Sequence, residues 1–155
     1  MANMKLVDEL NLLSHRVNKC WEHLDSTYHA HLLEFNKEYK MTPAVRALAG
    51  IDPLLTEGRE ILYNVQLGEH IDRQDPQWSL AALTVFGNFR GGFIDYPELG
   101  YRIRFNSGDF NLVRGRVVKH SIGDFTGQRI AVPHFTHSST WRSLEMENLV
   151  NETVH

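Results

Sequence analysis

The spacing of apolar residues changes character about a third of the way along the chain. From about residue 4 to residue 40 they recur in alternating steps of four and three residues, the period of a helix with one apolar face. No proline or glycine interrupts this segment before Pro43. The stripe consists of Leu6, Leu10, Leu13, Val17, Cys20 and Leu24, extended by Leu32 and Phe35. The pattern therefore predicts one long helix.

Two interpretations of this stripe stay open. A long seam with this spacing is typical of a coiled coil, which would join two copies of the chain in a homodimer. The alternative is a helix that lies across a sheet of its own chain. A connection with a short helix around Ala44–Ala49 follows, and the whole of residues 1–58 is predicted to be a helical support segment.

From Arg59 onward the apolar segments become short, and glycine, proline, asparagine and aspartate separate them at intervals of about ten residues. The predicted strands are Ile61–Gln66, Leu80–Phe86, Gly92–Ile94, Tyr101–Phe105, Phe110–Val113, Val117–Ile122 and Arg129–Phe135, besides the His70–Asp72 segment. This pattern predicts a mainly β core over residues 59–140, built as a jelly roll of two packed sheets. Residues 141–155 are predicted to be a polar tail with a helix over 144–150.

Composition limits the environment and the partners. The chain of 155 residues has the size of one domain, with a net charge of −3 and an isoelectric point near 6.3. This charge argues against bulk electrostatic binding of nucleic acid, although a few phosphates could still be held locally. Cys20 is the only cysteine, which excludes an intrachain disulfide and favours an intracellular setting. No apolar run has the roughly 18 residues that a membrane span needs, so no membrane partner is expected.

His70, Asp72 and His120 are the candidate metal ligands. Side chains alternate along a strand, so His70 and Asp72 lie on the same side. Two histidines and one carboxylate are the set that holds non-haem Fe(II) on one face and leaves other positions open. Arg129 follows His120 and offers a planar fork that can grip the carboxylate of a co-substrate. The sequence therefore indicates an iron-dependent oxygenase core.

Each of these residues also has an ordinary interpretation. His70 and Asp72 could belong to a surface turn, and His120 could be a hydrogen-bonded core histidine. A simple hairpin at residues 123–127 would set His120 and Arg129 on opposite faces. The site therefore requires the chain to cross from one sheet to the other between Gly123 and Gly127.

A resemblance to a known family rests on six segments in a fixed order. They are HIDRQDPQW (His70–Trp78), FGNFRGG (Phe86–Gly92), PELG (Pro97–Gly100), SGD (Ser107–Asp109), GRVVKHSI (Gly115–Ile122) and GQRIAVPHF (Gly127–Phe135). They resemble the double-stranded β-helix core, a cupin-like jelly roll, of Fe(II)/2-oxoglutarate-dependent dioxygenases. Within that superfamily the chain is most similar to short fungal members related to the TET/JBP nucleobase oxygenases.

The resemblance implies that His70, Asp72 and His120 bind Fe(II), and that Arg129 pairs with the distal carboxylate of 2-oxoglutarate. It implies an enzyme that uses 2-oxoglutarate and dioxygen to hydroxylate a C–H bond, with release of succinate and carbon dioxide. The expected substrate is a methylated nucleobase in DNA or RNA, flipped out of a duplex or presented single-stranded. A nuclear location would follow from a DNA substrate.

Neighbouring residues receive secondary roles. Asn64 and Ser121 are predicted co-substrate contacts, with a strand-end position as the equal alternative for Asn64. The predicted substrate contacts are Trp78, Tyr96, Arg114 and Arg116. Dry cavity walls are expected from Leu83, Val85, Ile130 and Val132, whereas His134 and His137 are expected at the surface or in the tail.

Two further functions remain as alternatives. The first keeps the chemistry and changes the substrate to a protein side chain or a small metabolite, as the acidic isoelectric point favours. The second is a catalytically inactive β-helix scaffold that dimerises through the N-terminal helix. Salt-sensitive binding to an oligonucleotide would separate the nucleobase substrate from the first alternative, and iron binding would exclude the second.

Overall fold

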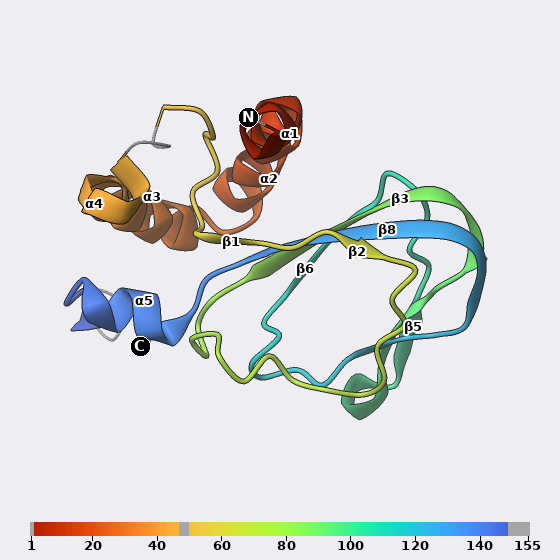
Figure 1. Cartoon of the computed structure of the whole chain (residues 1–155). Coiled ribbons are helices and arrows are strands. Elements are labelled where there is room, and N and C mark those ends of the chain that lie inside the picture. The colour runs from red at the N-terminus through yellow and green to blue at the C-terminus, as the bar shows by residue number, and fades with distance from the viewer. Residues whose placement is uncertain (1, 47–49, 149–155) are drawn as a thin grey trace. The chain divides into compact units, whose positions relative to one another are not determined.

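The computed structural model of the chain describes residues 2–46 and 50–148. The chain divides into two compact units, a helical unit of Met1–Glu57 with Ser139–His155 and a β unit of Gly58–Ser138. A helical N-terminal region and a β-rich core of jelly-roll type confirm the predicted fold class (Figure 1). None of the helices in the described ranges has the length and apolarity needed to cross a bilayer.

The N-terminal segment is three helices and not one, so the prediction of a single long helix is wrong. They are α1 (Ala2–Glu9), α2 (Asn11–Leu24) and α3 (Ser26–Met41). Asp25 leaves the helical region at φ −148° and ψ 83°, and its side chain accepts a hydrogen bond from the Tyr28 N–H at 2.9 Å. That is an N-cap, which starts a new helix inside a stretch whose apolar period continues unbroken.

The short helices also differ from the predictions. The predicted helix at 44–49 is α4 (Pro43–Arg46), and residues 47–49 lie outside the described residues. A helix does follow the β unit, but it is α5 (Ser138–Ser143). Residues 144 to 147 form turns where a helix was predicted, and residues 149–150 lie outside the described residues.

Half of the predicted apolar stripe is buried, namely Leu13, Val17, Leu32 and Phe35, whereas Leu6 and Leu24 are exposed. Val17 and Trp21 of α2 and Leu32 and Phe35 of α3 have no exposed surface, whereas Leu24 is 72% exposed. Phe35 also stacks on Trp141 of α5 at 4.4 Å between ring centroids. Packing within the chain therefore accounts for the buried half of the stripe, and a dimer through this segment stays a prediction.

Polar side chains tie the segment after α4 to the helices. Ser14 of α2 donates to the Asp52 carboxylate at 2.7 Å. The Asn36 amide of α3 donates to the carbonyls of Leu54 and Leu55 at 2.9 and 3.2 Å. Ser14 and Asn36 are both buried, so these hydrogen bonds satisfy polar groups that water does not reach.

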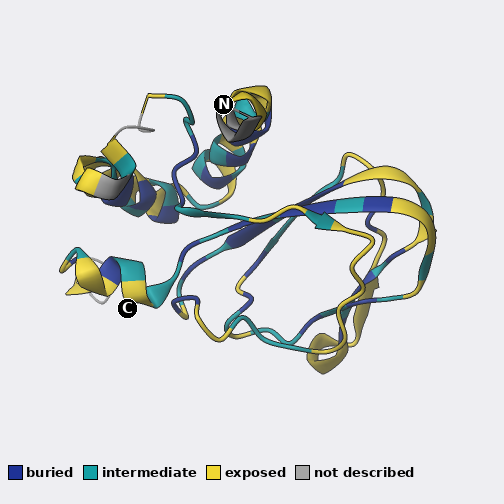
Figure 2. Ribbon diagram, viewed as in Figure 1, coloured by how far each residue is buried: buried dark blue, intermediate teal, exposed yellow. Residues whose placement is uncertain are grey.

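The β unit consists of two antiparallel sheets. Its strands are β1 (Gly58–Arg59), β2 (Leu62–Tyr63), β3 (Ala81–Gly91), β4 (Ile94–Tyr96), β5 (Tyr101–Ile103), β6 (Phe110–Val113), β7 (Ser121–Ile122) and β8 (Phe125–Phe135), with a 3-10 turn η1 at Pro97–Leu99. The larger sheet has the order β1-β8-β3-β6, and β2 also pairs with β8. The smaller sheet has the order β5-β4-β7. Apolar residues buried in this unit, among them Val85, Ile94 and Phe105, form its core (Figure 2).

β3 and β8 are longer than predicted because glycines that resemble turns lie inside them. The two strands pair from Ala82↔His134 to Gly91↔Phe125, through Gly87. Gly87 has a φ of +123°, and a Cβ there would lie 2.1 Å from the Gln128 carbonyl oxygen. Only glycine allows the two backbones to come this close, so Gly87 continues the strand that it was predicted to end.

The chain crosses between the two sheets directly after His120. β7 pairs with β4 in the smaller sheet, and β8 pairs with β3 in the larger one. The predicted crossing between Gly123 and Gly127 is therefore confirmed, and it removes the geometric objection to a site that contains both His120 and Arg129.

Candidate metal centre

The backbone brings the two histidines together. His70 and His120 form an isolated antiparallel bridge, in which each N–H donates to the other residue's carbonyl at 3.0 Å. Two residues after His70, the Asp72 N–H donates to the Gly115 carbonyl at 2.9 Å. Backbone hydrogen bonds thus fix the His70–Asp72 segment to the Gly115–His120 segment that precedes β7.

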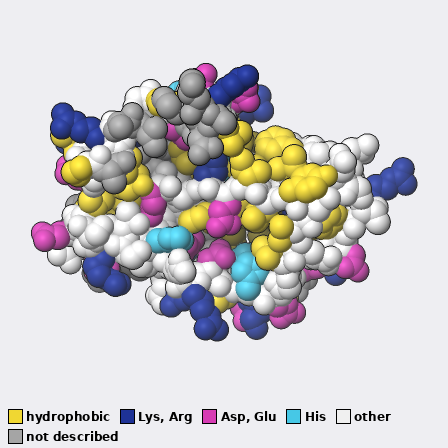
Figure 3. Space-filling view, viewed as in Figure 1, with side chains coloured by type: hydrophobic (Ala, Val, Ile, Leu, Met, Phe, Trp, Pro, Cys, Tyr) yellow, Lys and Arg dark blue, Asp and Glu magenta, His cyan; other side chains and the backbone are white. Residues whose placement is uncertain are grey.

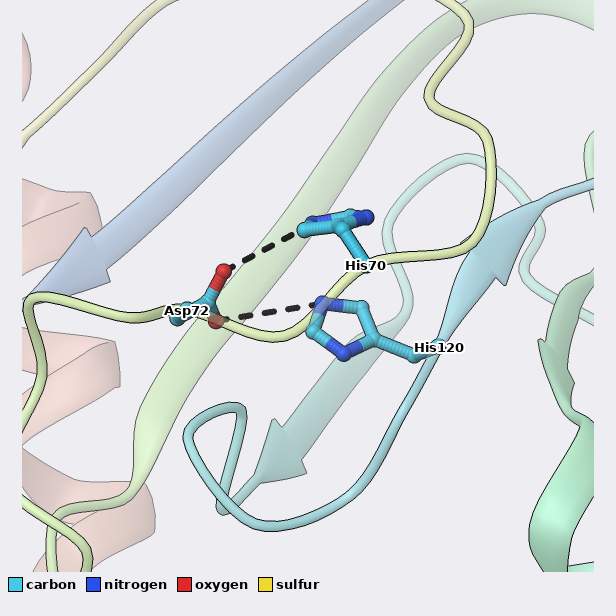
Figure 4. A group of neighbouring side chains, drawn as sticks. All are labelled: His70, Asp72 and His120. Carbon is cyan, nitrogen blue, oxygen red and sulfur yellow. Dashed lines mark ion pairs between the residues drawn. The ribbon is translucent and has the colours of Figure 1, made fainter.

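The three side chains converge (Figure 4). His70 Nε2 lies 3.5 Å from Asp72 Oδ1, and His120 Nε2 lies 3.8 Å from Asp72 Oδ2. Their potential ligand atoms all lie within 4.8 Å of one another. His70 Nδ1 lies 2.8 Å from the Gly68 carbonyl and His120 Nδ1 lies 3.0 Å from the Val118 carbonyl. Carbonyl acceptors at Nδ1 assign the proton to that nitrogen and leave each Nε2 lone pair facing the carboxylate.

This donor set fits a divalent transition-metal ion. Two neutral imidazole nitrogens and one carboxylate suit iron and its neighbours better than calcium or magnesium, which prefer oxygen ligands alone. Cis ligands at about 2.1 Å from an ion lie about 3 Å apart, so small side-chain rotations would bring these atoms into range. The His120 side chain is 5% exposed, whereas those of His70 and Asp72 are 33% and 30% exposed. The group is therefore closed on one side and open on the other.

Gly115 is a residue of this site that the sequence analysis did not single out. A Cβ at this position would lie 1.8 Å from Asp72 Oδ2 and 2.8 Å from its carboxyl carbon. Its φ is not in the left-handed region, so the need for glycine is space and not backbone conformation. Any larger residue would displace the carboxylate from the two histidines.

The metal group opens into a cavity of about 500 Å³. The main sheet supplies the walls through residues on one face of β3 and β8: Ala81, Leu83, Arg129, Ala131, Pro133 and Phe135. Of the predicted walls only Leu83 lines the cavity: Val85 is buried in the core, and alternation on β8 turns Ile130 and Val132 to the face opposite Arg129. At the mouth, Val65 and Leu67 continue a run of exposed apolar side chains from Ile61 and Tyr63, and Figure 3 shows hydrophobic side chains gathered over β2.

Arg129 lines the same cavity as an unneutralised cation. It is 2% exposed, and its Nε and Nη2 have no hydrogen-bond acceptor among the residues that the structure describes. Its guanidinium carbon lies 5.5 to 5.7 Å from the ring centroids of Phe125, Phe89 and Phe105. Burial lowers the pKa of Arg129 from its usual value, although a guanidinium stays charged near neutral pH. A buried cation without a carboxylate partner is costly, which indicates a place for an anionic group.

The two predicted co-substrate contacts have other positions. Asn64 is exposed at φ 53°, and its Oδ1 accepts the Arg129 N–H at 2.8 Å while its own N–H donates to the Arg129 carbonyl at 2.8 Å. It therefore holds the backbone of Arg129, which agrees with the strand-end alternative. Ser121 lies in β7 opposite Asp95, and it is absent from the described residues that line the cavity.

The structure does not gather the four predicted substrate residues at the cavity. Tyr96 is buried, its hydroxyl bonds Asn111 Nδ2 at 2.7 Å, and its ring lies 6.5 Å from that of His120. Arg116 Nη1 donates to the Arg73 carbonyl at 2.9 Å. Arg114 is exposed and Trp78 is half-buried. Within the part of the chain that the structure describes, none of these four lines the cavity.

Other residues do line it near the metal group, namely Gln74, Asp75, Phe135 and His137. Both His134 and His137 were expected at the surface or in the tail. His137 instead lines the cavity, and His134 is completely buried on the other face of β8. The alternation that starts at Arg129 runs through 131, 133 and 135 to 137. Counting in twos from Arg129 would have found Phe135 and His137.

Comparison with known proteins adds one finding. No family model matches the sequence, and no curated protein matches it. A solved structure of NgTET1 in complex with 5mC DNA is similar, with a TM-score of 0.63 at 16% sequence identity. The match covers 87% of this chain and 50% of that chain, so the chain spans about half the length of NgTET1 in that structure. At this identity the likeness shows the fold.

Proposed function

We propose that this chain is an Fe(II)- and 2-oxoglutarate-dependent dioxygenase. One observation carries the proposal: a group of two histidines and a carboxylate shares a cavity with a buried arginine that has no anionic partner. The fold likeness to NgTET1 supports it. A scaffold has no use for such an arginine, because an unpaired buried charge only lowers stability.

The residues have distinct tasks in this proposal. His70 and His120, through Nε2, and the Asp72 carboxylate would hold Fe(II). Arg129 would pair with the distal carboxylate of 2-oxoglutarate through N–H groups that now lack an acceptor. When bound, the iron, the keto acid and dioxygen supply the oxidation of a C–H bond, with succinate and carbon dioxide released.

The rest of the chain keeps these groups in position. The carbonyls of Gly68 and Val118 orient the imidazoles, and the Gly115 carbonyl fixes the backbone of Asp72. Asn64 holds the backbone of Arg129. The apolar side chains of Leu83, Ala131 and Pro133 would keep water away from the reacting atoms.

The proposed substrate is a methylated nucleobase in DNA or RNA, as for short members of the TET/JBP group, and a nuclear location would follow from DNA. NgTET1 is solved with 5mC DNA. This cavity is lined by the aromatic ring of Phe135, which stacks on His137, and by the polar side chain of Gln74, which suits the edge of a base. The base would have to enter unpaired, and the exposed apolar side chains of Val65 and Leu67 at the mouth would contact its flanks.

An anaerobic titration with Fe(II) and 2-oxoglutarate tests the cofactor part. We expect a visible metal-to-ligand charge-transfer band with wild type that is absent in His120→Ala. In Arg129→Gln the band should need about 100-fold more 2-oxoglutarate, the scale of two lost charge-assisted hydrogen bonds. His15→Ala, which removes an exposed histidine of α2, is the matched control and should behave as wild type.

Two results would go against this proposal. Absence of the band with folded wild-type protein would exclude the cofactor site. A band that forms normally, with succinate production that a 5-methylcytosine oligonucleotide does not increase, would leave the cofactor chemistry intact and redirect the substrate search to protein side chains or metabolites.

A further inference from the structure

The β unit contains a second cavity, of about 420 Å³, that shares no lining residue with the metal-site cavity. It lies between the end of β3 with the turn that follows, and the segment that follows β5. Its lining side chains are Phe89, Arg90, Phe93, Arg104, Phe105 and Asn106, with Gly91 and Ser107 completing it. The proposed dioxygenase function makes no use of it.

Arg90 and Arg104 line this cavity, and no acidic side chain neutralises them there. No acidic residue is among those that line it. Arg90 and Arg104 are exposed, and neither guanidinium has an ion pair or hydrogen bond to any residue that the structure describes. The neighbouring Arg102 shows the contrast, because its Nη2 lies 3.2 Å from Asp95 Oδ2 and its pKa is raised by that carboxylate. The two cavity arginines are therefore free for an external anion.

Phenylalanine rings form the apolar part of the wall. Phe105 is 2% exposed, whereas Phe89 and Phe93 are half-buried, and the Arg102 guanidinium carbon lies 5.9 Å from the Phe93 ring centroid. Phe89 and Phe105 are also two of the rings around the Arg129 guanidinium, at 5.6 and 5.7 Å. These contacts fix the rings in the core, so the cavity has a wall that exists before any ligand arrives.

We propose that this second cavity binds a nucleotide. Guanidinium groups hold phosphate through paired, charge-assisted hydrogen bonds, which assigns the phosphate to Arg90 and Arg104. Bases pack on aromatic side chains, which assigns the base to the half-buried Phe89 and Phe93 and leaves Phe105 as their support. The volume lies in the range of small-ligand sites. The nucleotide is either free or one unit of a nucleic-acid strand, since both offer the same phosphate and base.

Isothermal titration of the full chain with dAMP tests this proposal without iron or 2-oxoglutarate. We expect wild type to bind dAMP, and Arg90→Gln/Arg104→Gln to bind it about 100-fold more weakly, with about tenfold lost for each arginine. The matched control is Arg16→Gln/Arg46→Gln, which removes two exposed arginines from the helical unit and should bind as wild type.

Two further ligands identify the source and test the aromatic wall. Inorganic phosphate should bind more weakly than dAMP, and equal affinity would overturn the assignment of the base to the phenylalanines. A short oligonucleotide, (dA)6, that binds more tightly than dAMP and loses this advantage in the arginine double variant would identify a strand as the source. Equal dAMP affinity of wild type and the double variant, or no binding to folded wild type at millimolar dAMP, would overturn the proposal.

Discussion

Two buried polar side chains, one from each unit, differ in how far their hydrogen bonds are made within the protein. In the helical unit, the Asn36 amide is 7% exposed and donates to the carbonyls of Leu54 and Leu55. In the β unit, Arg129 is 2% exposed, and its Nε and Nη2 have no acceptor. Asn36 makes its hydrogen bonds within the protein and so stabilises the fold. Arg129 keeps part of its hydrogen-bonding capacity free and faces a cavity.

The difference has an energetic meaning. An internal hydrogen bond contributes about 0.5–1.5 kcal/mol, whereas a buried donor left unpaired costs about 1–3 kcal/mol and more if it is charged. A folded chain therefore retains an unpaired buried cation only where something other than stability requires it. For this pair, the satisfied Asn36 amide is a structural anchor, and the unsatisfied Arg129 guanidinium is the candidate for binding an anion.

Among the variants proposed here, Gly115→Ala should cause the largest change, a loss of affinity for Fe(II). The new Cβ would overlap Asp72 Oδ2 and push the carboxylate away from His70 and His120. We expect the affinity for Fe(II) to fall roughly 100-fold or more, because a ligand is displaced and not only its support. Unfolding should change little, since Asp72 is partly exposed and can rotate toward solvent. An anaerobic Fe(II) titration beside a thermal melt measures both.

The matched control for this variant is Gly68→Ala. A Cβ at Gly68 would meet no atom within 4 Å, and only its backbone carbonyl contacts His70. This variant should bind Fe(II) as wild type does. Wild-type Fe(II) affinity in Gly115→Ala would show that Asp72 is not a ligand.

Arg129→Met sharpens the comparison between the units, because stability and binding should change in opposite directions. Methionine has a similar volume, suits a cage of aromatic rings and removes the buried charge. We expect the ligand-free protein to gain about 1–3 kcal/mol in free energy of unfolding. Its affinity for 2-oxoglutarate should fall about 100-fold, in line with two lost hydrogen bonds to a charged group. Urea unfolding and the charge-transfer titration measure the two quantities.

Arg114→Met is the control for stability, because Arg114 is an exposed arginine of the same unit. Its free energy of unfolding should stay within about 0.5 kcal/mol of wild type. A destabilised ligand-free Arg129→Met would mean that the guanidinium stabilises the β core through its ring contacts, and the contrast with Asn36 would then fail.

Local patterns account for much of the fold. Turn residues located most strands, but the predicted Val117–Ile122 is a strand only over Ser121–Ile122, and the predicted Gly92–Ile94 overlaps β4 at Ile94 alone. The crossing after β7 followed from the requirement that His120 and Arg129 share a site. Asp25 was missed because the helical period of apolar residues runs through it without interruption. An aspartate followed by serine is nevertheless a recognisable helix start, so the information was present and periodicity overrode it.

In the candidate site, too, local patterns predicted some features, whereas contacts between distant segments could not be predicted. The predicted strand at His70–Asp72 is wrong, because His70 makes only an isolated bridge to His120, although the two side chains do converge. Strand alternation does hold in β8, where it extends from Arg129 to Phe135 and on to His137. The contact of Gly115 with Asp72 could not be predicted, because it depends on how two segments distant in sequence approach one another. The role of Asn64 toward the Arg129 backbone is of the same kind, since it needs the pairing of β2 with β8.

The smallest effect is expected in the helical unit, where Asn36→Ala should change only the free energy of unfolding. This change leaves the buried carbonyls of Leu54 and Leu55 without their amide donor, so we expect a loss of about 1–3 kcal/mol in free energy of unfolding. Asn11→Ala is the graded control, because its amide is only half-buried and makes one longer bond, 3.3 Å to the Ile51 carbonyl. Asn11→Ala should lower the free energy of unfolding by less than Asn36→Ala does. Urea unfolding followed by helical circular dichroism measures both. If Asn36→Ala were as stable as wild type while Arg129→Met were more stable, satisfied and unsatisfied buried groups would not differ in the way proposed, and relief of the Arg129 charge alone would explain the result.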